Sequence, residues 1–433
     1  MKSIPSDWKS DRLKDVAAIN ASALPASTDP DYEFDYLEIS NVDYYGVINP
    51  QAIERLRYED APSRARRRVA KNCTLVSSVR PNLQAVAFFP EGRDDFVCST
   101  GFNVVQANEV ILSPEFAYFA LISDHARQYF EATAKGVGYP AVDDKDFSSF
   151  AVPLPLLPEQ VLIAMYLDAS CSAIDAAVSA KRRQIQTLDA LTIATIQRAV
   201  TRGLNSRAEL KPSGLDWLPE VPSHWRIRQI KRRCSLLRGK FSHRPRNDPA
   251  FYDGEYPFVQ TGDITGAQKY IRTYSQTLNE LGFSVSKMFP KGTLVMSIAA
   301  NVGDVAILDF EACFPDSMVG LVPNHKTDLN FLYYLMRGMK EVLLRSAVLT
   351  TQLNLNYVRI GTNFAPFPPK QEQEEIAAFL DARNQEIRGT KSVLNQQIKT
   401  LVAYRKSLIH ECVTGQRRVR EADMARVSNS KAV

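Results

Sequence analysis

The chain has 433 residues, of which 45% are hydrophobic and 23% charged, and its formal net charge is +5. This length supports two or three domains with separate cores, and the composition excludes a disordered or fibrous protein. The sequence has no stretch near 20 apolar residues that would predict a membrane span, and no apolar run close to the N-terminus that would predict a signal peptide. We therefore expect a cytoplasmic protein.

The first residues include Ile4-Pro5-Ser6-Asp7-Trp8, which resembles Val221-Pro222-Ser223-His224-Trp225 later in the chain, at an offset of 217 residues. Such self-similarity indicates a repeated architecture. A stronger copy follows when residues 151–201 are aligned with 364–414 at an offset of 213, without a gap, because 19 of the 51 positions are identical. The sequence therefore predicts the order domain, helix, domain, helix.

The two repeated segments, 153–203 and 366–415, predict long helices. Prolines and a glutamate open each segment, and both suit the first turn of a helix. Apolar residues then recur at heptad spacing, which favours a coiled-coil seam, although each helix packing only on its own domain is the alternative. Some 43 helical residues would span ~65 Å. The expected seam residues are Leu167, Ile174, Ile185, Leu188, Leu380, Ile387, Leu394, Leu401 and Leu408.

The predicted fold class is α+β, with two mixed α/β domains separated by two long helices that form an antiparallel coiled coil with pseudo-twofold symmetry. The domains are expected at residues 1–152 and 217–365, with a linker at 204–216 and a disordered tail at 416–433. Short β-rich runs on either side of Gly303-Asp304 predict a hairpin. Helices are predicted at residues 114–131 and 328–345.

The six cysteines occur singly, without a C-x-x-C pair, which favours reduced, buried thiols over disulfides or a zinc site. These residues are Cys73, Cys98, Cys171, Cys234, Cys313 and Cys412.

Two basic runs are candidates for contact with DNA phosphates, which dominate nucleic-acid affinity. Between Arg226 and Arg246 the chain has nine Lys or Arg and no Asp or Glu. A solvated face or a surface for a protein partner is the alternative interpretation. The candidates are Arg64, Arg66, Arg67, Arg68, Arg226, Arg228, Lys231, Arg232, Arg233, Lys240, Arg244 and Arg246.

Motifs that would predict a catalytic or metal centre are missing. There is no phosphate-binding G-x-x-x-x-G-K-[ST] loop and no H-E-x-x-H helix. The stretch Asn247-Asp248-Pro249-Ala250-Phe251 lacks the second proline of an adenine methyltransferase strip. We therefore expect a protein without catalytic residues, metal or bound cofactor. The alternatives are a stand-alone DNA-binding regulatory or architectural protein and a self-sufficient nuclease or methyltransferase.

The repeated strip Pro153-x-Pro155 through Leu167-Asp168, with its second copy at 366–381, resembles the conserved regions of type I restriction-modification specificity subunits. The helix ends, Val200-Thr201-Arg202-Gly203 and Val413-Thr414-Gly415, are similar as well. The resemblance covers residues 1 to about 418. In the first domain, Gly136-Val137-Gly138-Tyr139-Pro140 occupies the position at which the second domain has Thr351-Gln352.

The resemblance implies a subunit that recognises an asymmetric, bipartite DNA target while its partners do the chemistry. The implied partners are two adenine-N6 methyltransferase subunits, which use S-adenosylmethionine, and two restriction subunits, which use ATP and Mg²⁺. No membrane partner is implied. Base contacts are expected in loops, because Arg, Asn and Gln side chains read base edges well. The candidates are Arg80, Asn82, Thr351 and Gln352.

Overall fold

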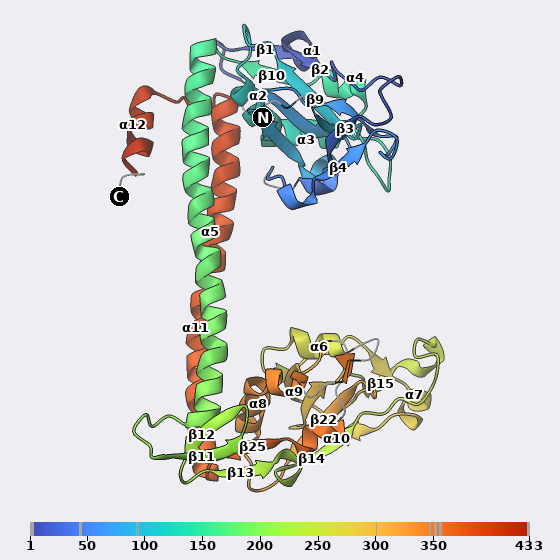
Figure 1. The fold of residues 1–433 in the computed structure, drawn as a ribbon, viewed down its shortest axis with the longest axis vertical. Coiled ribbons are helices and arrows are strands. Elements are labelled where there is room, and N and C mark those ends of the chain that lie inside the picture. Colours follow the sequence, from blue (N-terminus) through green and yellow to red (C-terminus); the bar gives the residue numbers. More distant parts are fainter. Residues whose placement is uncertain are drawn as a thin grey trace. The chain divides into compact units, whose positions relative to one another are not determined.

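The computed structural model describes residues 4–42, 46–91, 93, 95–299, 301–345, 348–349, 353–354 and 357–430. The chain divides into two compact units, Met1–Arg182 with Asn395–Val433, and Arg183–Leu394. Helices α5 (Leu157–Arg202) and α11 (Lys370–Val413) each contribute a segment to both units (Figure 1). We call the part of the first unit before α5 the first domain, and the part of the second unit between α5 and α11 the second domain.

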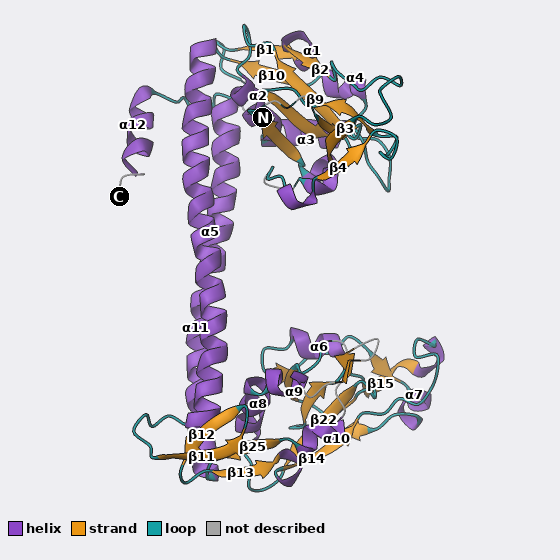
Figure 2. Ribbon diagram, viewed as in Figure 1, coloured by secondary structure: helices purple, strands orange, loops and turns teal. Residues whose placement is uncertain are grey.

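The first domain contains two four-stranded sheets, with helices packed against them (Figure 2). One sheet is antiparallel with the order β2–β9–β6–β7, and α2 packs on β6 and β7. The other has the order β4–β3–β8–β5. The bounds are β1 (Lys9–Arg12), α1 (Leu13–Val16), β2 (Ala17–Ile19), β3 (Glu33–Leu37), β4 (Glu54–Arg57), β5 (Ala65–Arg68), β6 (Cys73–Ser77), β7 (Val86–Phe89), β8 (Phe96–Ser99), β9 (Phe102–Ala107), α2 (Pro114–Ile122), α3 (Asp124–Thr133), α4 (Asp144–Ser148) and β10 (Ala151–Leu154).

The second domain is built on a five-stranded sheet, β14–β22–β19–β20–β16. Its first four strands repeat the order of β2–β9–β6–β7, and β19 and β20 form the predicted hairpin across Gly303. The bounds are β11 (Leu210–Leu215), β12 (Leu218–Pro222), β13 (Arg226–Gln229), β14 (Cys234–Arg238), β15 (Tyr252–Pro257), α6 (Thr261–Gly266), β16 (Tyr270–Ile271), β17 (Thr277–Leu278), α7 (Glu280–Ser284), β18 (Met288–Phe289), β19 (Leu294–Ser297), β20 (Val305–Leu308), β21 (Ala312–Cys313), β22 (Met318–Pro323), α8 (Leu329–Gly338), α9 (Lys340–Arg345), β23 (Val348–Leu349), β24 (Leu353–Asn354), α10 (Tyr357–Thr362) and β25 (Phe364–Phe367).

Within each unit the segments of α5 and α11 pair in antiparallel order. In the first unit Arg405 Nε lies 3.2 Å from an Asp175 carboxylate oxygen, and Lys181 Nζ donates to Gln397 Oε1 at 2.7 Å. In the second unit Lys391 forms an ion pair with Asp189. The antiparallel coiled coil predicted from the repeat is therefore present in both units, and Lys181, Lys391 and Arg405 each have a partner on the facing helix.

The predicted seam residues differ in burial along the helices. Leu167, Ile174, Leu380, Ile387 and Leu408 are buried and belong to the core of their unit. Ile185, Leu188, Leu394 and Leu401 are only half-buried.

A buried glutamine at the same position of each repeat joins the start of α5 and of α11 to the preceding domain. Gln160 Oε1 accepts from the Ser113 backbone N–H at 2.9 Å, and its Nε2 donates to the Ile111 and Pro155 carbonyls at 3.0 and 2.9 Å. Ser113 is the residue that caps α2. All three hydrogen-bonding groups of this side chain are satisfied inside the protein, as a buried amide requires.

The second copy repeats this arrangement at Gln373. Its Oε1 accepts from the Asp328 N–H at 2.9 Å, and its Nε2 donates to the Lys326 and Pro368 carbonyls at 3.1 and 2.9 Å. Asp328 caps α8, the counterpart of α2. The internal repeat therefore extends from the sequence to individual hydrogen bonds.

Four predicted segments need correction. The tail expected to be disordered forms α12 (Glu421–Ser430), and the 204–216 linker contains β11, which pairs with β12. The predicted helix 114–131 is two helices, because the Ser123 side chain caps a new start by accepting from the Ala126 N–H. The predicted helix 328–345 is likewise divided into α8 and α9.

One helix in the described part of the chain, α5, is long and apolar enough to cross a membrane by length and composition alone. The core helix of a soluble protein passes the same test, so a single helix of this kind is a weak indication.

We predict that Gln373→Ala destabilises the second unit by ~2–3 kcal/mol, since the change removes the side-chain partner of the buried Pro368 carbonyl and of the partly buried Asp328 N–H. The measurement is the free energy of unfolding in urea. Gln371→Ala is the matched control, because Gln371 is exposed on the same helical turn and its side chain bonds only Glu375 among the described residues. Equal stability of the two variants would contradict the role given to Gln373.

Candidate nucleic-acid interface

The basic run of the second domain divides into two groups. Arg226 and Arg228 are exposed on β13, and Lys231 and Arg232 are exposed just after this strand. β13 pairs with β25, the strand that directly precedes α11. Arg233 is half-buried: it donates to the Lys326 carbonyl and lies over the Phe367 ring, and burial lowers its pKa. Lys240, Arg244 and Arg246 follow β14 in a separate loop, where the two arginines contact Asp316.

The basic run of the first domain lies on β5, and its four arginines have different surroundings. Arg64 forms an ion pair with Glu38 at 2.6 Å, and the guanidinium groups of Arg66 and Arg68 lie over tyrosine rings at 4.7 and 6.0 Å. Arg67 points inward instead. Its Nη1 donates to the Phe102 carbonyl and, at 3.1 Å, to Asn103 Oδ1, and desolvation by burial lowers its pKa.

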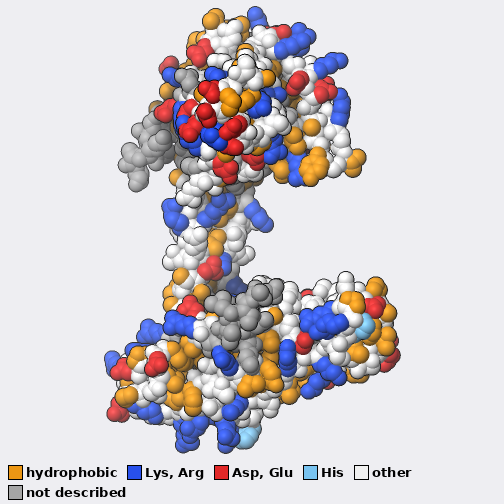
Figure 3. Space-filling view, turned by 45° about the vertical axis from the view of Figure 1, so that its right-hand side comes forward, with side chains coloured by type: hydrophobic (Ala, Val, Ile, Leu, Met, Phe, Trp, Pro, Cys, Tyr) orange, Lys and Arg blue, Asp and Glu red, His pale blue; other side chains and the backbone are white. Residues whose placement is uncertain are grey.

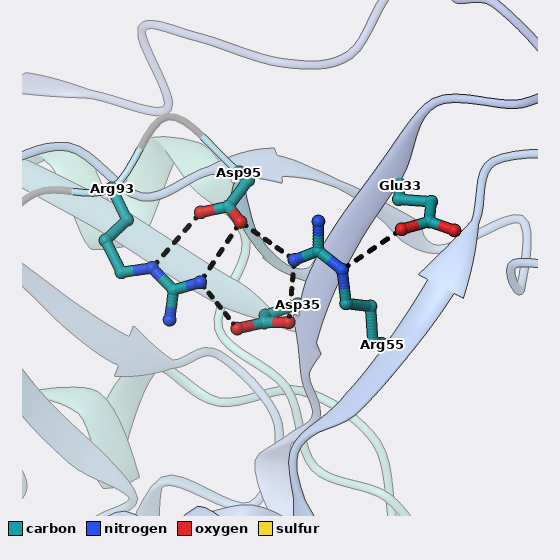
Figure 4. Close-up of polar contacts among 5 residues, drawn as sticks. All are labelled: Glu33, Asp35, Arg55, Arg93 and Asp95. Carbon is teal, nitrogen blue, oxygen red and sulfur yellow. Dashed lines mark hydrogen bonds and ion pairs between the residues drawn. The ribbon is translucent and has the colours of Figure 1, made fainter.

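The same sheet of the first domain has an ion-pair network in which acidic groups are in excess (Figure 4). Arg55 contacts Glu33, Asp35 and Asp95 at 3.2, 3.2 and 2.8 Å, and Arg93 contacts Asp35 and Asp95 at 2.8 and 3.0 Å. Two guanidinium groups thus face three carboxylates, and the contacts with these carboxylates raise the pKa of Arg55. Sequence reasoning did not single out these residues, because they come from β3, β4 and the approach to β8.

The predicted base-contact residues Arg80 and Asn82 are exposed in a loop after β6. Arg80 has a left-handed backbone, with φ of 50°, and its N–H donates to the Pro140 carbonyl at 2.7 Å. Its guanidinium lies 4.5 Å from the centre of the Tyr139 ring, which is 74% exposed. An exposed arginine stacked on an exposed aromatic ring is suited to contact with nucleic-acid bases and backbone.

Residues Thr351 and Gln352, the base-contact candidates of the second domain, lie outside the described residues. No group of three or more His, Cys, Asp or Glu that could hold a metal occurs within the described ranges. The six cysteines are free and buried. Burial raises the pKa of Cys171 to about 11 and that of Cys234 to about 12, which makes these thiols poor nucleophiles.

An ion pair between a largely buried lysine and a partly exposed aspartate, which the sequence did not predict, joins the second domain to α11. Lys269 Nζ lies 2.6 and 2.7 Å from the two carboxylate oxygens of Asp381. The Tyr334 hydroxyl donates to the same carboxylate at 2.5 Å, and the Asn384 amide donates to that hydroxyl at 3.1 Å. Burial and the hydrogen bond to Asp381 raise the pKa of Tyr334 well above its usual value. This group is a structural junction, since it links Lys269 and Tyr334 of the second domain to Asp381 and Asn384 of α11.

The repeated domains, each joined to a spacer helix through the same buried glutamine, agree with the comparison with known families. A family model described as "Type I restriction modification DNA specificity domain" matches residues 5–186 and 223–400. The chain belongs to this family. Its two target-recognition domains are the first and second domains, and its spacer helices are α5 and α11.

Two relatives of this specificity subunit cover 96% and 76% of its length. A specificity subunit of the type I restriction enzyme MjaX from Methanocaldococcus jannaschii is 24% identical over 96% of this chain and 95% of its own. The HindI specificity subunit of Haemophilus influenzae is 22% identical over 76% of this chain and 82% of its own.

Two solved structures have the same fold. The HsdS subunit from Thermoanaerobacter tengcongensis superposes with a TM-score of 0.54 at 22% identity, covering 96% of this chain and 98% of that one. A chain from "Structural basis underlying complex assembly and conformational transition of the type I R-M system" gives a TM-score of 0.78 at 22% identity, covering 95% and 99%.

Charge on the two recognition domains differs in arrangement. In the view of Figure 3, acidic and basic side chains alternate on the first unit, whereas Lys and Arg form patches on the second unit. The candidate arginines also differ in how accessible they are to a DNA phosphate. Those of β13 are exposed, whereas the Arg67 guanidinium is hydrogen-bonded inside the first domain.

We predict that Arg67→Met lowers the stability of the first domain by ~1–3 kcal/mol, because the Phe102 carbonyl loses its side-chain donor. The salt dependence of DNA binding should stay the same. The measurements are urea unfolding and DNA affinity at several salt concentrations, with Arg66→Met on the same strand as the control. A flatter salt dependence with unchanged stability would show that Arg67 contacts phosphate instead.

Proposed function

We propose that this specificity subunit selects an asymmetric, bipartite DNA target for a type I restriction-modification complex and has no catalytic residues of its own. Each target-recognition domain would read one half of the target, with an unread gap between the halves. The observation that carries the proposal is that the two domains are joined to their helices in the same way but have different polar surfaces. The Gln160 and Gln373 contacts are the same, whereas the polar groups on the outer strands and loops differ.

The chemistry would reside in partner subunits. We propose two methyltransferase subunits, which transfer a methyl group from S-adenosylmethionine to adenine N6, and two restriction subunits, which use ATP and Mg²⁺. We place the complex in the cytoplasm, where the six buried thiols would stay reduced.

The spacer helices have a surface suited to the methyltransferase partner. Leu191 and Val393, which both belong to the second unit, are 41% and 58% exposed. Apolar side chains on a helix pair whose seam is only half-buried favour the docking of a further apolar helix.

The modular proposal predicts the outcome of a domain exchange. Replacing residues 1–150 with the matching domain of a relative should change one half of the methylated sequence and leave the other half intact. Lengthening both spacer helices by a few residues should change only the unread gap. Methylome sequencing of a host that expresses the complex measures both. Exchange of the first domain that altered both halves at once would overturn modular recognition.

The docking proposal predicts that Val393→Glu weakens association with the methyltransferase at least about tenfold, because a charge would be buried in an apolar contact. Gln396→Glu is the control, since it adds the same charge at an exposed polar position on the same helix. Co-purification and affinity measurements distinguish the two variants. If no methyltransferase associates with the unmodified chain, a stand-alone DNA-binding protein is the correct interpretation.

Methylation or cleavage by the purified chain alone, in the presence of S-adenosylmethionine or Mg²⁺, would favour a self-sufficient enzyme.

A further inference from the structure

Three arginines of the second target-recognition domain converge on one carboxylate. Arg244 Nη2 lies 3.2 Å from Asp316 Oδ2, Arg246 Nη2 contacts Asp316 Oδ1, and Arg238 Nη2 lies 3.9 Å from Oδ2. Arg238 Nε also donates to the Asp316 backbone carbonyl at 2.9 Å. We call Arg238, Arg244 and Arg246 the arginine cluster. One carboxylate neutralises one guanidinium, so the cluster keeps two positive charges.

The loop that carries the cluster is fixed in place. Gly239 lies so close to the turn before β22 that an added Cβ would come within 2.1 Å of the Pro315 carbonyl oxygen, so only glycine fits there. The side chain of Phe241 is buried in an aromatic group, and the Lys240 N–H donates to the Phe314 carbonyl at 3.1 Å. Arg244 Nη1 also donates to the carbonyls of Phe241 and His243, both at 2.7 Å. The guanidinium groups are therefore held in position before any ligand arrives.

The cluster is open to solvent and keeps donors available. The side chains of Arg238, Arg244 and Arg246 are 51%, 51% and 46% exposed. A guanidinium carries five N–H donors, and among the described residues the Arg246 side chain has Asp316 as its recorded acceptor. Spare donors on several fixed guanidinium groups match the oxygens of a phosphate.

The ion-pair network of the first domain shows the opposite balance of charge. The exposed fraction of the Arg55 side chain, 49%, is similar to that of Arg246, 46%. Arg55, however, lies among three carboxylates (Figure 4). Its charge is neutralised locally, so it has little attraction for an anion. Exposure alone therefore does not distinguish the two sites, whereas the excess of guanidinium groups over carboxylates does.

The cluster is specific to the second domain. It lies at the ends of β14 and β22, which correspond in sheet order to β2 and β9. At that place in the first domain Asn20 Nδ2 donates to Asn103 Oδ1 at 2.9 Å, and Arg67 is turned inward. The same framework position thus carries two mutually bonded asparagines and one inward-turned guanidinium in the first domain, and an exposed excess of guanidinium groups in the second.

We propose that the arginine cluster binds a phosphate of the DNA backbone at the half-site read by the second domain, and that Asp316 is its positioning residue. This inference rests on the proposed function and adds one contact to it. Asp316 would hold two guanidinium groups toward the same phosphate, so its loss should weaken binding although the surface becomes more positive.

The test measures DNA affinity of the full chain in complex with its methyltransferase, by fluorescence anisotropy at several salt concentrations. One duplex carries the methylated target and the other a scrambled sequence. Arg246→Gln should weaken binding to both duplexes by the same factor, roughly threefold to tenfold, and reduce the slope of log affinity against log salt by about 1. Equal loss on both duplexes is expected because a phosphate carries no sequence.

The Asp316→Asn variant is the more discriminating test of the positioning role. It should weaken binding when Arg246 is present and have a smaller effect in the Arg246→Gln background, because part of the effect of the aspartate would pass through that arginine and the rest through Arg244. Arg55→Gln is the matched control: it removes the same charge at similar exposure and should leave affinity and salt slope unchanged. Thermal unfolding of each variant checks that the fold is retained, and among the described residues the Arg246 side chain contacts only the Asp316 carboxylate.

Three results would overturn the inference. Unchanged binding by Arg246→Gln would make the cluster a solvated surface, and a loss confined to the target duplex would make it a base contact. Tighter binding by Asp316→Asn in both backgrounds would mean that the carboxylate only repels DNA. In each case the unmodified complex still discriminates the two duplexes; if it does not, the proposed function itself fails.

Discussion

A buried glutamine amide joins each target-recognition domain to the start of its spacer helix, and this repeated contact fixes the frame that carries the reading surface. Gln160 and Gln373 join the first turn of a spacer helix to the capped start of a domain helix. Burying an amide is unfavourable unless all its groups are bonded, so the geometry tolerates little variation. Outside this junction the domain surface can change without disturbing the frame. A reader of varied DNA sequences needs that separation, because its contacts must change while its framework does not.

Because the domain surfaces can vary, the two domains arrange their charged side chains differently. The first domain surrounds Arg55 and Arg93 with carboxylates, which makes a neutral or acidic face. The second domain places three arginines around Asp316 and leaves an excess of positive charge. Both use exposed ion pairs, which add little stability in water. Their difference therefore concerns what the surface attracts rather than how firmly the domain folds.

The helices and their pairing could be predicted from the sequence because they depend on local periodicity. Heptad spacing and the gapless repeat identified α5 and α11, and the turn at Gly303 identified the β19–β20 hairpin. Residues brought together from distant parts of the chain were not predictable. Arg246 finds Asp316 across 70 residues, and Arg67 finds Asn103 across 36, so equal letters in a basic run have unequal roles. The ordered tail follows the same rule, since Arg418 pairs with Asp7.

The spacer illustrates how polar seam residues and incomplete burial combine. Arg405 with Asp175 in the first unit, and Lys391 with Asp189 in the second, fix the register of each helix pair. Such pairs specify the arrangement but contribute less stability than apolar residues would at the same positions. Ile185 and Leu188 are only half-buried, so two helices alone leave apolar surface in water. A seam that determines register without completing its own core is best stabilised by further helices, which is the arrangement that a subunit acting through partners requires.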